Sequence, residues 1–252
     1  MGRSNRNKIS HNLVKENNHK VIKEKFRYQR EEEILAKPLL PMNDKQREFM
    51  DLIRKKSCVV ATGFAGTSKS YIPAAMAADM YRLGQVSKIV VTRPAISSSK
   101  SIGFLKGDVN GKMQNWLGPV IAVLKERMGN GAYDVALNSG DIQYIPMETL
   151  KGSSFNNSFV IIEEASDLTK EELIKIVTRI GKGTTMTITG DILQSELAHG
   201  AGLNWLSNFI TRNNMQEHFG FVEFNDYSHI VRSGIVKDFL INLHREEGIT
   251  KV

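Results

Sequence analysis

The chain has 252 residues, enough for one large α/β domain or two small ones with a buried core. Hydrophobic residues make up 41% and charged residues 24% of the sequence, a composition that excludes wholesale disorder and fibrous or collagen-like architectures. The sequence has one cysteine and does not open on a basic and then apolar leader, so we expect a cytoplasmic protein. Its apolar stretches are too short to cross a bilayer, so we expect no membrane anchor.

The net charge of +7 is concentrated at the start of the chain. Residues 1–40 hold ten lysines and arginines against five glutamates, so they carry +5. Such a segment is typical of an arm that contacts the phosphates of a polyanion, and equally of a solvated tail. The two prolines of Lys37-Pro-Leu-Leu-Pro41 oppose a continuous helix there. We therefore predict a basic arm over residues 1–40, partly helical or disordered, followed by one domain over residues 41–252.

From residue 41 onward, short apolar runs rich in β-branched residues alternate with stretches long enough to form helices. The predicted strands are Cys58–Ala61, Ile89–Thr92, Phe159–Ile162, Met186–Thr189 and Phe219–Val222. The predicted helices are Asp44–Lys55, Lys69–Leu83, Met113–Met128, Lys170–Arg179, Gly202–Phe209 and Val231–His244. Runs that are apolar on both faces are typical of strands buried in a parallel sheet. The alternation predicts an α/β fold of three layers, with a ligand beyond the carboxyl ends of a mostly parallel sheet.

A phosphate-binding loop is indicated by the sequence Gly63-Phe-Ala-Gly66-Thr-Ser68-Lys69-Ser70, which follows a predicted strand and opens a predicted helix. Glycines let successive backbone N–H groups turn toward a β-phosphate, and the amino end of the helix adds positive partial charge. Lys69 is expected to bridge the β- and γ-phosphate oxygens, and the Ser70 hydroxyl to coordinate Mg²⁺. Ser68 stands where a second glycine is usual, so its side chain either points away from the phosphate or adds a donor.

Two carboxylates, Glu163 and Glu164, come directly after the apolar strand at 159–162. In nucleoside triphosphatases the first acid steadies the metal, and the second orients the attacking water and accepts its proton. We assign Glu163 to the metal and Glu164 to the water. Glu163 replaces the more common aspartate, and an acidic pair that caps a helix is the alternative interpretation.

A polar cluster, Thr189-Gly190-Asp191-Ile-Leu-Gln194, ends another apolar strand and reaches the same edge of the sheet. Gln194 is a candidate for contact with the γ-phosphate or the lytic water, and Asp191 for the metal shell. Upstream of the loop, Gln46 carries a donor and an acceptor that match the N6/N7 edge of adenine, although an ordinary surface glutamine is the alternative. The predicted nucleotide-binding residues are Gln46, Gly63, Phe64, Ala65, Gly66, Thr67, Ser68, Lys69, Ser70 and Tyr71.

With these residues in place, residues 41–245 resemble the PhoH-like P-loop ATPases, a family whose RecA-like core is similar to that of superfamily 1 helicases. The resemblance rests on the loop at 63–70, the acids at 163–164 and four further segments. These are Thr92-Arg93-Pro94-Ala95, Gly103-Phe104-Leu105-Lys106-Gly107-Asp108, Thr189-Gly190-Asp191 with Gln194, and Ile230-Val231-Arg232-Ser233. Lys106 replaces the family's proline, and Lys151-Gly152 stands where the family often has Arg-Gly.

The resemblance implies ATP and Mg²⁺ as cofactors and RNA or single-stranded nucleic acid as the partner. It also implies a homo-oligomer, with a hexameric ring as one arrangement. A chain with a single core needs a neighbour's arginine to complete a motor site, and Arg232 is the first candidate for that arginine. Arg93 and Lys106 are candidates for contact with nucleic-acid phosphates. A surface salt bridge is the alternative role for Arg232 and for Arg93.

The sequence therefore predicts an Mg²⁺-dependent ATPase that couples ATP turnover to RNA or single-stranded nucleic acid, in a helicase-like or translocase-like manner. Its catalytic residues would be Lys69, Glu163, Glu164, Gln194 and Arg232. The alternative is a nucleotide-gated nucleic-acid-binding module with little or no turnover. The departures at Ser68 and Glu163 keep this alternative open.

Overall fold

The computed structural model describes residues 38–94, 116–147, 150, 154–191 and 201–246. The chain divides into two units, Met1–Leu40 and Pro41–Val252. All of the helices and strands named below lie in the second unit.

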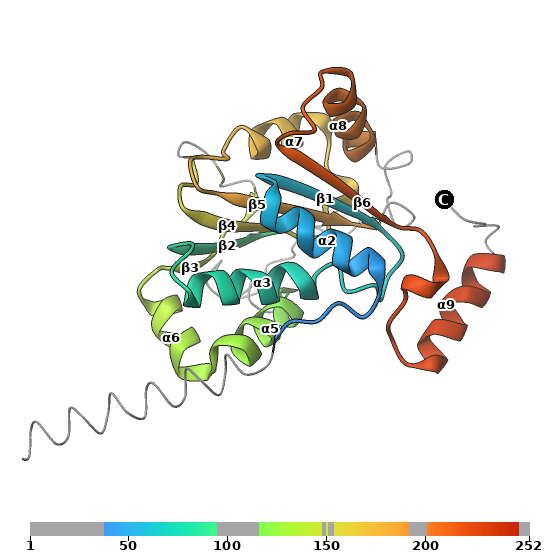
Figure 1. Cartoon of the computed structure of the whole chain (residues 1–252), viewed down its shortest axis with the longest axis horizontal. Coiled ribbons are helices and arrows are strands. Elements are labelled where there is room, and N and C mark those ends of the chain that lie inside the picture. Colours follow the sequence, from blue (N-terminus) through green and yellow to red (C-terminus); the bar gives the residue numbers. More distant parts are fainter. Residues whose placement is uncertain (1–37, 95–115, 148–149, 151–153, 192–200, 247–252) are drawn as a thin grey trace, which may run out of the picture. The chain divides into compact units, whose positions relative to one another are not determined.

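A six-stranded sheet forms the centre of this unit (Figure 1). Its strands are β1 (Cys58–Gly63), β2 (Lys88–Thr92), β3 (Ile142–Tyr144), β4 (Ser158–Ile162), β5 (Thr185–Gly190) and β6 (Phe219–Phe224). They lie in the order β3-β2-β4-β5-β1-β6, and every pairing is parallel. The carboxyl ends of all six strands therefore lie at one edge of the sheet.

The strands are apolar on both faces because helices cover both faces. On one face Val60, Ile162 and Ile188 pack with residues of α7 (Lys170–Val177) and α8 (Ala201–Arg212). Successive strand residues alternate between faces, so Val59 and Ile161 face the opposite layer, and both are fully buried. This packing gives the three-layer α/β arrangement that the sequence predicts.

The second helical layer contains α2 (Asp44–Lys55) and α3 (Tyr71–Arg82). Helix α2 contacts β1 and β6, while α3 contacts β2 and β4. Helix α5 (Gly118–Met128) packs on α3, and α6 (Asn130–Asn138) packs on α5 and β3. Two 3₁₀ turns, η2 (Ala165–Asp167) and η4 (Tyr227–His229), and the terminal helix α9 (Gly234–Glu246) complete the described elements. None of the helices in the described part of the chain is both long and apolar enough to cross a bilayer.

All five predicted strands and the described parts of all six predicted helices are present, with small differences at their ends. The prediction for residues 113–115 lies outside the described residues. Strand β3 was not predicted because it has only three residues, one of them the polar Gln143. Helix α6 was not predicted because Gly131 and Asn138 are weak helix formers. The lone cysteine, Cys58, is fully buried in β1, and burial raises the pKa of its thiol to about 12, so it packs and does not react.

The strand order identifies where a ligand enters. From β1 the chain crosses past β5 and β4 to β2, whereas from β5 it crosses β1 to reach β6. Connections that leave neighbouring strands in opposite directions open a crevice at their carboxyl ends, and this crevice lies between β1 and β5. The register places Thr62 opposite Gly190 and Gly63 opposite Phe224. The loop after β1 therefore starts at this crevice.

Candidate functional site

The loop between β1 and α3 has the backbone that its glycines predict. Gly63 has φ +117° and Gly66 has φ +77°, conformations that side chains rarely adopt. A Cβ on Gly63 would also collide with the backbone of Phe224 in β6. Gly63 is therefore required both for its torsion angle and for the close approach of β6 to the start of the loop.

Ser68 shares this unusual backbone without being glycine. Its φ is +72°, in the left-handed region, where a Cβ is disfavoured by roughly 1 kcal/mol. Its hydroxyl has no hydrogen-bond partner among the described residues, so it is available as an additional donor. The serine therefore strains the loop at the position where loops of this kind usually have glycine.

The side chain of Lys69 folds back over the loop to which it belongs. Its ammonium donates to the backbone oxygens of Gly63 and Phe64, each at 2.6 Å, and approaches the Thr67 hydroxyl at 3.5 Å. Burial lowers the pKa of Lys69 to about 8, while the negative charges of Asp191, Glu163 and Glu164 oppose this shift. The site thus holds one partly desolvated cation among three carboxylates. An anionic ligand would compete with the loop oxygens for this cation.

Ser70 and Glu163 connect the loop to the acidic strand end. The Ser70 hydroxyl donates to Oε2 of Glu163 at 2.5 Å, and the Thr189 hydroxyl of β5 approaches Oε1 at 3.2 Å. Glu163 is 7% exposed. Burial raises the pKa of this carboxyl, and the two hydroxyl donors oppose the rise. A hydroxyl and a carboxylate side by side are the oxygen ligands that Mg²⁺ takes, so this pair fits the ion.

The second acid differs from the first in exposure and in backbone. Glu164 is exposed and has φ +57°, again in the left-handed region. Its charge still acts on Lys69 and on Glu163. Asp191 follows β5 at the same edge, and its backbone N–H donates to the Ser166 hydroxyl at 3.2 Å. Glu163 is buried and bonded to the loop, whereas Glu164 beside it is exposed, so the two carboxylates can perform different chemical tasks.

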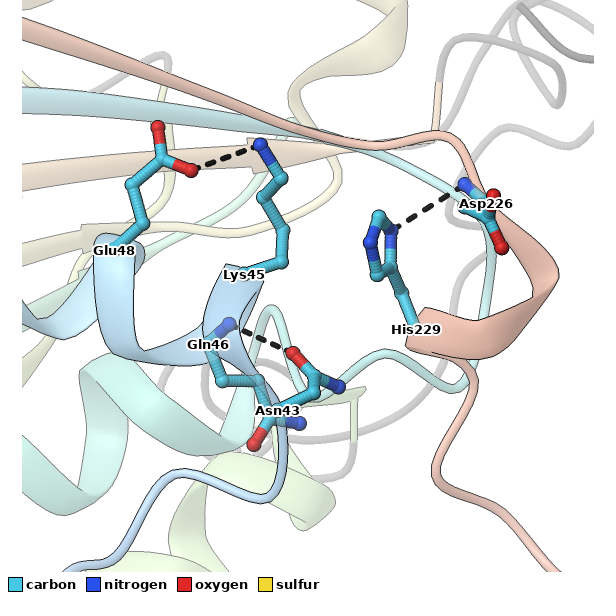
Figure 2. Close-up of polar contacts among 6 residues, drawn as sticks. All are labelled: Asn43, Lys45, Gln46, Glu48, Asp226 and His229. Atoms are coloured by element: carbon cyan, nitrogen blue, oxygen red, sulfur yellow. Dashed lines mark hydrogen bonds and ion pairs between the residues drawn. The ribbon is translucent and has the colours of Figure 1, made fainter.

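Gln46 anchors the start of α2 to the loop. Its side chain accepts from the backbone N–H of Met42 at 2.8 Å and donates to the backbone oxygen of Thr67 at 3.3 Å. Gln46 is 2% exposed, so the alternative of a surface glutamine is wrong. Figure 2 shows Gln46 beside its helix cap Asn43, with His229 opposite this first turn of α2. Contact between Gln46 and adenine stays a prediction.

An aromatic cluster supports the loop from the C-terminal side of the chain. The Phe64 ring stacks on Tyr227 of η4, with centroids 5.0 Å apart, and it meets the His244 ring of α9 at a tilt, with centroids 4.7 Å apart. Phe64 is 1% exposed, and its N–H donates to the Phe224 carbonyl at 2.9 Å. Phe64 therefore holds the loop in place, and neither its ring nor its N–H is directed to a ligand. We call Phe64, Tyr227 and His244 the loop-supporting stack.

Arg232 lies against the loop of its own chain. The backbone N–H of Val231 donates to the Gly66 oxygen at 3.0 Å, and a Cβ built on Gly66 would lie 2.9 Å from Cγ of Arg232. Arg232 is exposed. The sequence predicted this arginine for a neighbouring subunit's site, whereas the structure puts it beside the loop of the same chain.

Arg93, at the end of β2, is directed along the same edge of the sheet. Its guanidinium lies over the Trp116 ring, 5.6 Å from the centroid, and donates to the Trp116 oxygen at 3.3 Å. Its charge lowers the pKa of Glu163, against the larger effect of burial. Burial raises the pKa of the Tyr71 hydroxyl and the charge of Glu126 raises it further, so this side chain lies near α5. Nucleic-acid contact by Arg93 stays a prediction.

Two predicted site residues, Gln194 and Lys106, lie outside the described residues, as does Lys151. Other contributors were missed by sequence reasoning: Thr189 as a donor to Glu163, and Tyr227 and His244 in the loop-supporting stack. Thr189 was seen only as part of its motif. Nothing in the spacing of the two aromatic residues signals a contact with residue 64, because that contact depends on the path of the chain after β6.

The chain is similar to known proteins along most of its length. The family model described as PhoH-like protein matches residues 38–243. Protein PhoH of Escherichia coli (strain K12) is 33% identical over 189 residues, which cover 74% of this chain and 53% of that protein. The PhoH-like proteins of Mycobacterium tuberculosis and Bacillus subtilis are 31% and 32% identical, over 66% and 62% of this chain and 47% and 49% of theirs. The chain thus spans about half the length of these relatives.

Replacing Ser68 with glycine is expected to stabilise the protein by about 0.5–1 kcal/mol, because glycine adopts a positive φ without the Cβ penalty. Urea unfolding followed by circular dichroism measures the difference. Ser68→Ala is the matched control, since it keeps the Cβ and should give no gain. An equal gain in both variants would show that the hydroxyl, and not the torsion angle, is the cause.

The pKa of Lys69 predicts a pH dependence of nucleotide binding. A bound phosphate favours the ammonium form, so the complex keeps a proton that the free protein loses above pH 8. The affinity for ATP should therefore fall as pH rises above 8, approaching about tenfold per pH unit. Calorimetry in two buffers of different ionisation enthalpy should detect proton uptake on binding at pH 9.

Lys69→Arg is the control for this profile, because arginine keeps its charge over the whole range. The affinity of that variant, whatever its absolute value, should not change between pH 7.5 and 9.5. A wild-type affinity that is also constant, without proton uptake, would contradict the assignment of Lys69 as the ligand-facing cation.

Proposed function

Because this chain belongs to the PhoH-like family, we propose that it binds ATP with Mg²⁺ and hydrolyses it, and that turnover is coupled to RNA or single-stranded nucleic acid. The observation that carries the proposal is the hydrogen bond between Ser70 and Glu163. It brings the end of a glycine-rich loop that follows β1 together with the first acid after β4, across the end of β5 that lies between them. Lys69 lies in the same loop, held by two of its backbone oxygens.

In this proposal the loop binds the phosphates. Gly63, Gly66 and Ser68 all have positive φ, a backbone that turns N–H groups inward, and α3 begins immediately after the loop. Lys69 would exchange its bonds to loop oxygens for bonds to the β- and γ-phosphates. The desolvation that lowers the pKa of Lys69 strengthens its attraction to these oxygens.

Ser70 and Glu163 would hold the metal, which would neutralise charge on the phosphate oxygens when bound. The two side chains are already in contact, so the ion would replace their mutual hydrogen bond. The Thr189 hydroxyl would keep the second oxygen of Glu163 in place. Glu163 exceeds aspartate by one methylene group, and this donor from β5 fixes the longer side chain.

Glu164 is our candidate for the residue that orients the attacking water and accepts its proton. It is exposed, whereas Glu163 is buried and bonded to two hydroxyls. Its positive φ is a strained conformation for a glutamate, of the kind that persists at functional sites. These differences support the division of work between the two acids.

Coupling to nucleic acid is supported by the charge of residues 1–40 and by the resemblance to the family. The arm carries +5 of the net +7, which suits phosphate contacts. Arg93, directly after β2, is close enough to Glu163 to affect the pKa of that carboxyl, so a ligand that draws Arg93 away would change the electrostatics of the first acid. A single core per chain favours a homo-oligomer, with a hexameric ring as one arrangement.

Lys69→Ala is expected to lower ATP turnover by about 100-fold or more, because the cation that faces the phosphates is lost. Glu164→Gln should retain ATP binding and lose turnover by a factor of about 10² to 10⁴, since the amide cannot accept the proton from water. Phosphate release and binding of fluorescent mant-ATP measure the two effects separately.

Lys175→Ala and Glu171→Gln are the matched controls, because both side chains are exposed on α7, away from the loop. Both should behave as wild type. Unaltered turnover in Lys69→Ala would defeat the ATPase proposal. Tight ATP binding without phosphate release in the wild type, with and without single-stranded RNA, would favour the nucleotide-gated binding module instead.

The coupling proposal predicts that single-stranded RNA stimulates turnover and that the affinity for RNA falls steeply with salt. Each phosphate contact contributes about 0.7 to the slope of log affinity against log salt. Changing both Lys25 and Arg27 of the arm to alanine should lower that slope by about 1.4 if both contact phosphates. Titration of turnover with poly(U) at several salt concentrations measures the slope.

Changing Lys175 and Lys182 to alanine, outside the arm, is the control and should leave the slope unchanged. An unchanged slope in the arm variant would remove these two residues from the nucleic-acid interface. Turnover that no single-stranded RNA or DNA alters would contradict the coupling and leave an uncoupled ATPase.

A further inference from the structure

The last residue of β6 and the segment that follows it contact the phosphate-binding loop at three points. The Phe64 N–H donates to the Phe224 oxygen at 2.9 Å, and the Val231 N–H donates to the Gly66 oxygen at 3.0 Å. Between these bonds, Tyr227 stacks on the Phe64 ring. Residues 224–232, here called the strap, therefore follow the loop from its first residues to its tip.

The strap positions one arginine. Its last residue, Arg232, has its aliphatic stem over Gly66, where a Cβ would lie 2.9 Å from Cγ, 3.3 Å from Cδ and 3.5 Å from Nε. The absence of a side chain on Gly66 thus provides the space for this stem. On one side Ile230 is 3% exposed and fixes the strap, and on the other α9 begins at Gly234 and is attached through His244.

The guanidinium of Arg232 is exposed and has no ion pair or hydrogen bond with any residue in the described part of the chain. A surface salt bridge, one of the roles considered for it, is not formed there. Its stem is fixed, and among the described residues its charge is unpaired, beside a loop whose backbone suits phosphate oxygens. An arginine held in this way is able to bind an anion. Its guanidinium matches the geometry of a phosphate, and its side chain loses little further conformational freedom on binding.

We propose that Arg232 binds the triphosphate held by the loop of its own chain, and that the strap and the loop-supporting stack position it for this. The inference rests on the proposed function, because it needs a nucleotide in the loop. It differs from the role predicted from the sequence, in which a neighbouring subunit supplies this arginine. Each chain then supplies both Lys69 and Arg232 to one ligand.

The first test measures the affinity for mant-ATP with Mg²⁺. Arg232→Ala should bind about tenfold more weakly than wild type, Arg232→Lys should fall between them, and Arg245→Ala should match wild type. Arg245 is a matched control because it is an exposed arginine of α9 that the structure does not place at the loop. Wild-type affinity in Arg232→Ala would overturn the proposal.

The second test distinguishes an arginine that acts in the site of its own chain from one that acts in the site of a neighbouring chain. Chains with Lys69→Ala and chains with Arg232→Ala, carrying different tags, are co-expressed and purified through both tags. If Arg232 serves its own chain, no chain in the mixture has both groups, and turnover should not exceed that of either parent. If it serves a neighbour, pairs with one intact site form, and recovered turnover would overturn the proposal.

If the two tagged chains do not co-purify, no neighbouring chain completes the site. The affinity of Arg232→Ala for mant-ATP then decides by itself whether Arg232 binds the triphosphate. The proposed function has its own control, since failure of wild type to bind or turn over ATP would refute the ATPase itself. Wild-type binding that depends on Lys69 but not on Arg232 would refute only the inference about the arginine.

Discussion

The geometry of the candidate site depends on one hydrogen bond, from the Ser70 hydroxyl to the Glu163 carboxylate. It joins residues 93 positions apart in the chain, and it crosses the end of β5, which lies between β1 and β4. A parallel sheet makes this possible because all strands finish at one edge. Burial opposes a charge on Glu163, and the donors Ser70 and Thr189 offset that cost. Removing either donor would leave a buried acceptor less satisfied and the acid less well oriented.

Strain at this edge is concentrated on both sides of that bond. Ser68 and Glu164 are two of the four non-glycine residues with positive φ in the described part of the chain, and they flank the two partners in sequence. A fold tolerates such conformations where surrounding contacts determine them, and the neighbouring hydrogen bonds provide these contacts. The strain at Ser68 explains physically why glycine is usual there. The strain at Glu164 turns the backbone sharply after a buried strand, so that one acid stays inside and the next is exposed.

Much of this arrangement is predictable from local patterns. Apolar runs such as Phe159–Ile162 identify the buried strands, and the glycine spacing at 63–66 identifies the loop, because both depend on a few adjacent residues. The contacts of Gln46 and the loop-supporting stack were not predictable. They depend on how separate segments meet in three dimensions, and a buried glutamine has the same local sequence as an exposed one. Strand β3 is short and half polar, so pairing with β2 decides its conformation more than its own sequence does.

The strap links the loop to the last helix of the chain. Helix α9 has one buried residue, His244, and that residue packs on Phe64 of the loop, while Ile235 and Phe239 are 81% and 66% exposed. The attachment of α9 therefore relies on the residue that supports the loop between β1 and α3. A change in the loop that moves the Phe64 ring must break or carry with it the stack on Tyr227 and His244. Because linkage is reciprocal, whatever fixes α9 also restricts the loop, and a ligand that fixes the loop restricts α9.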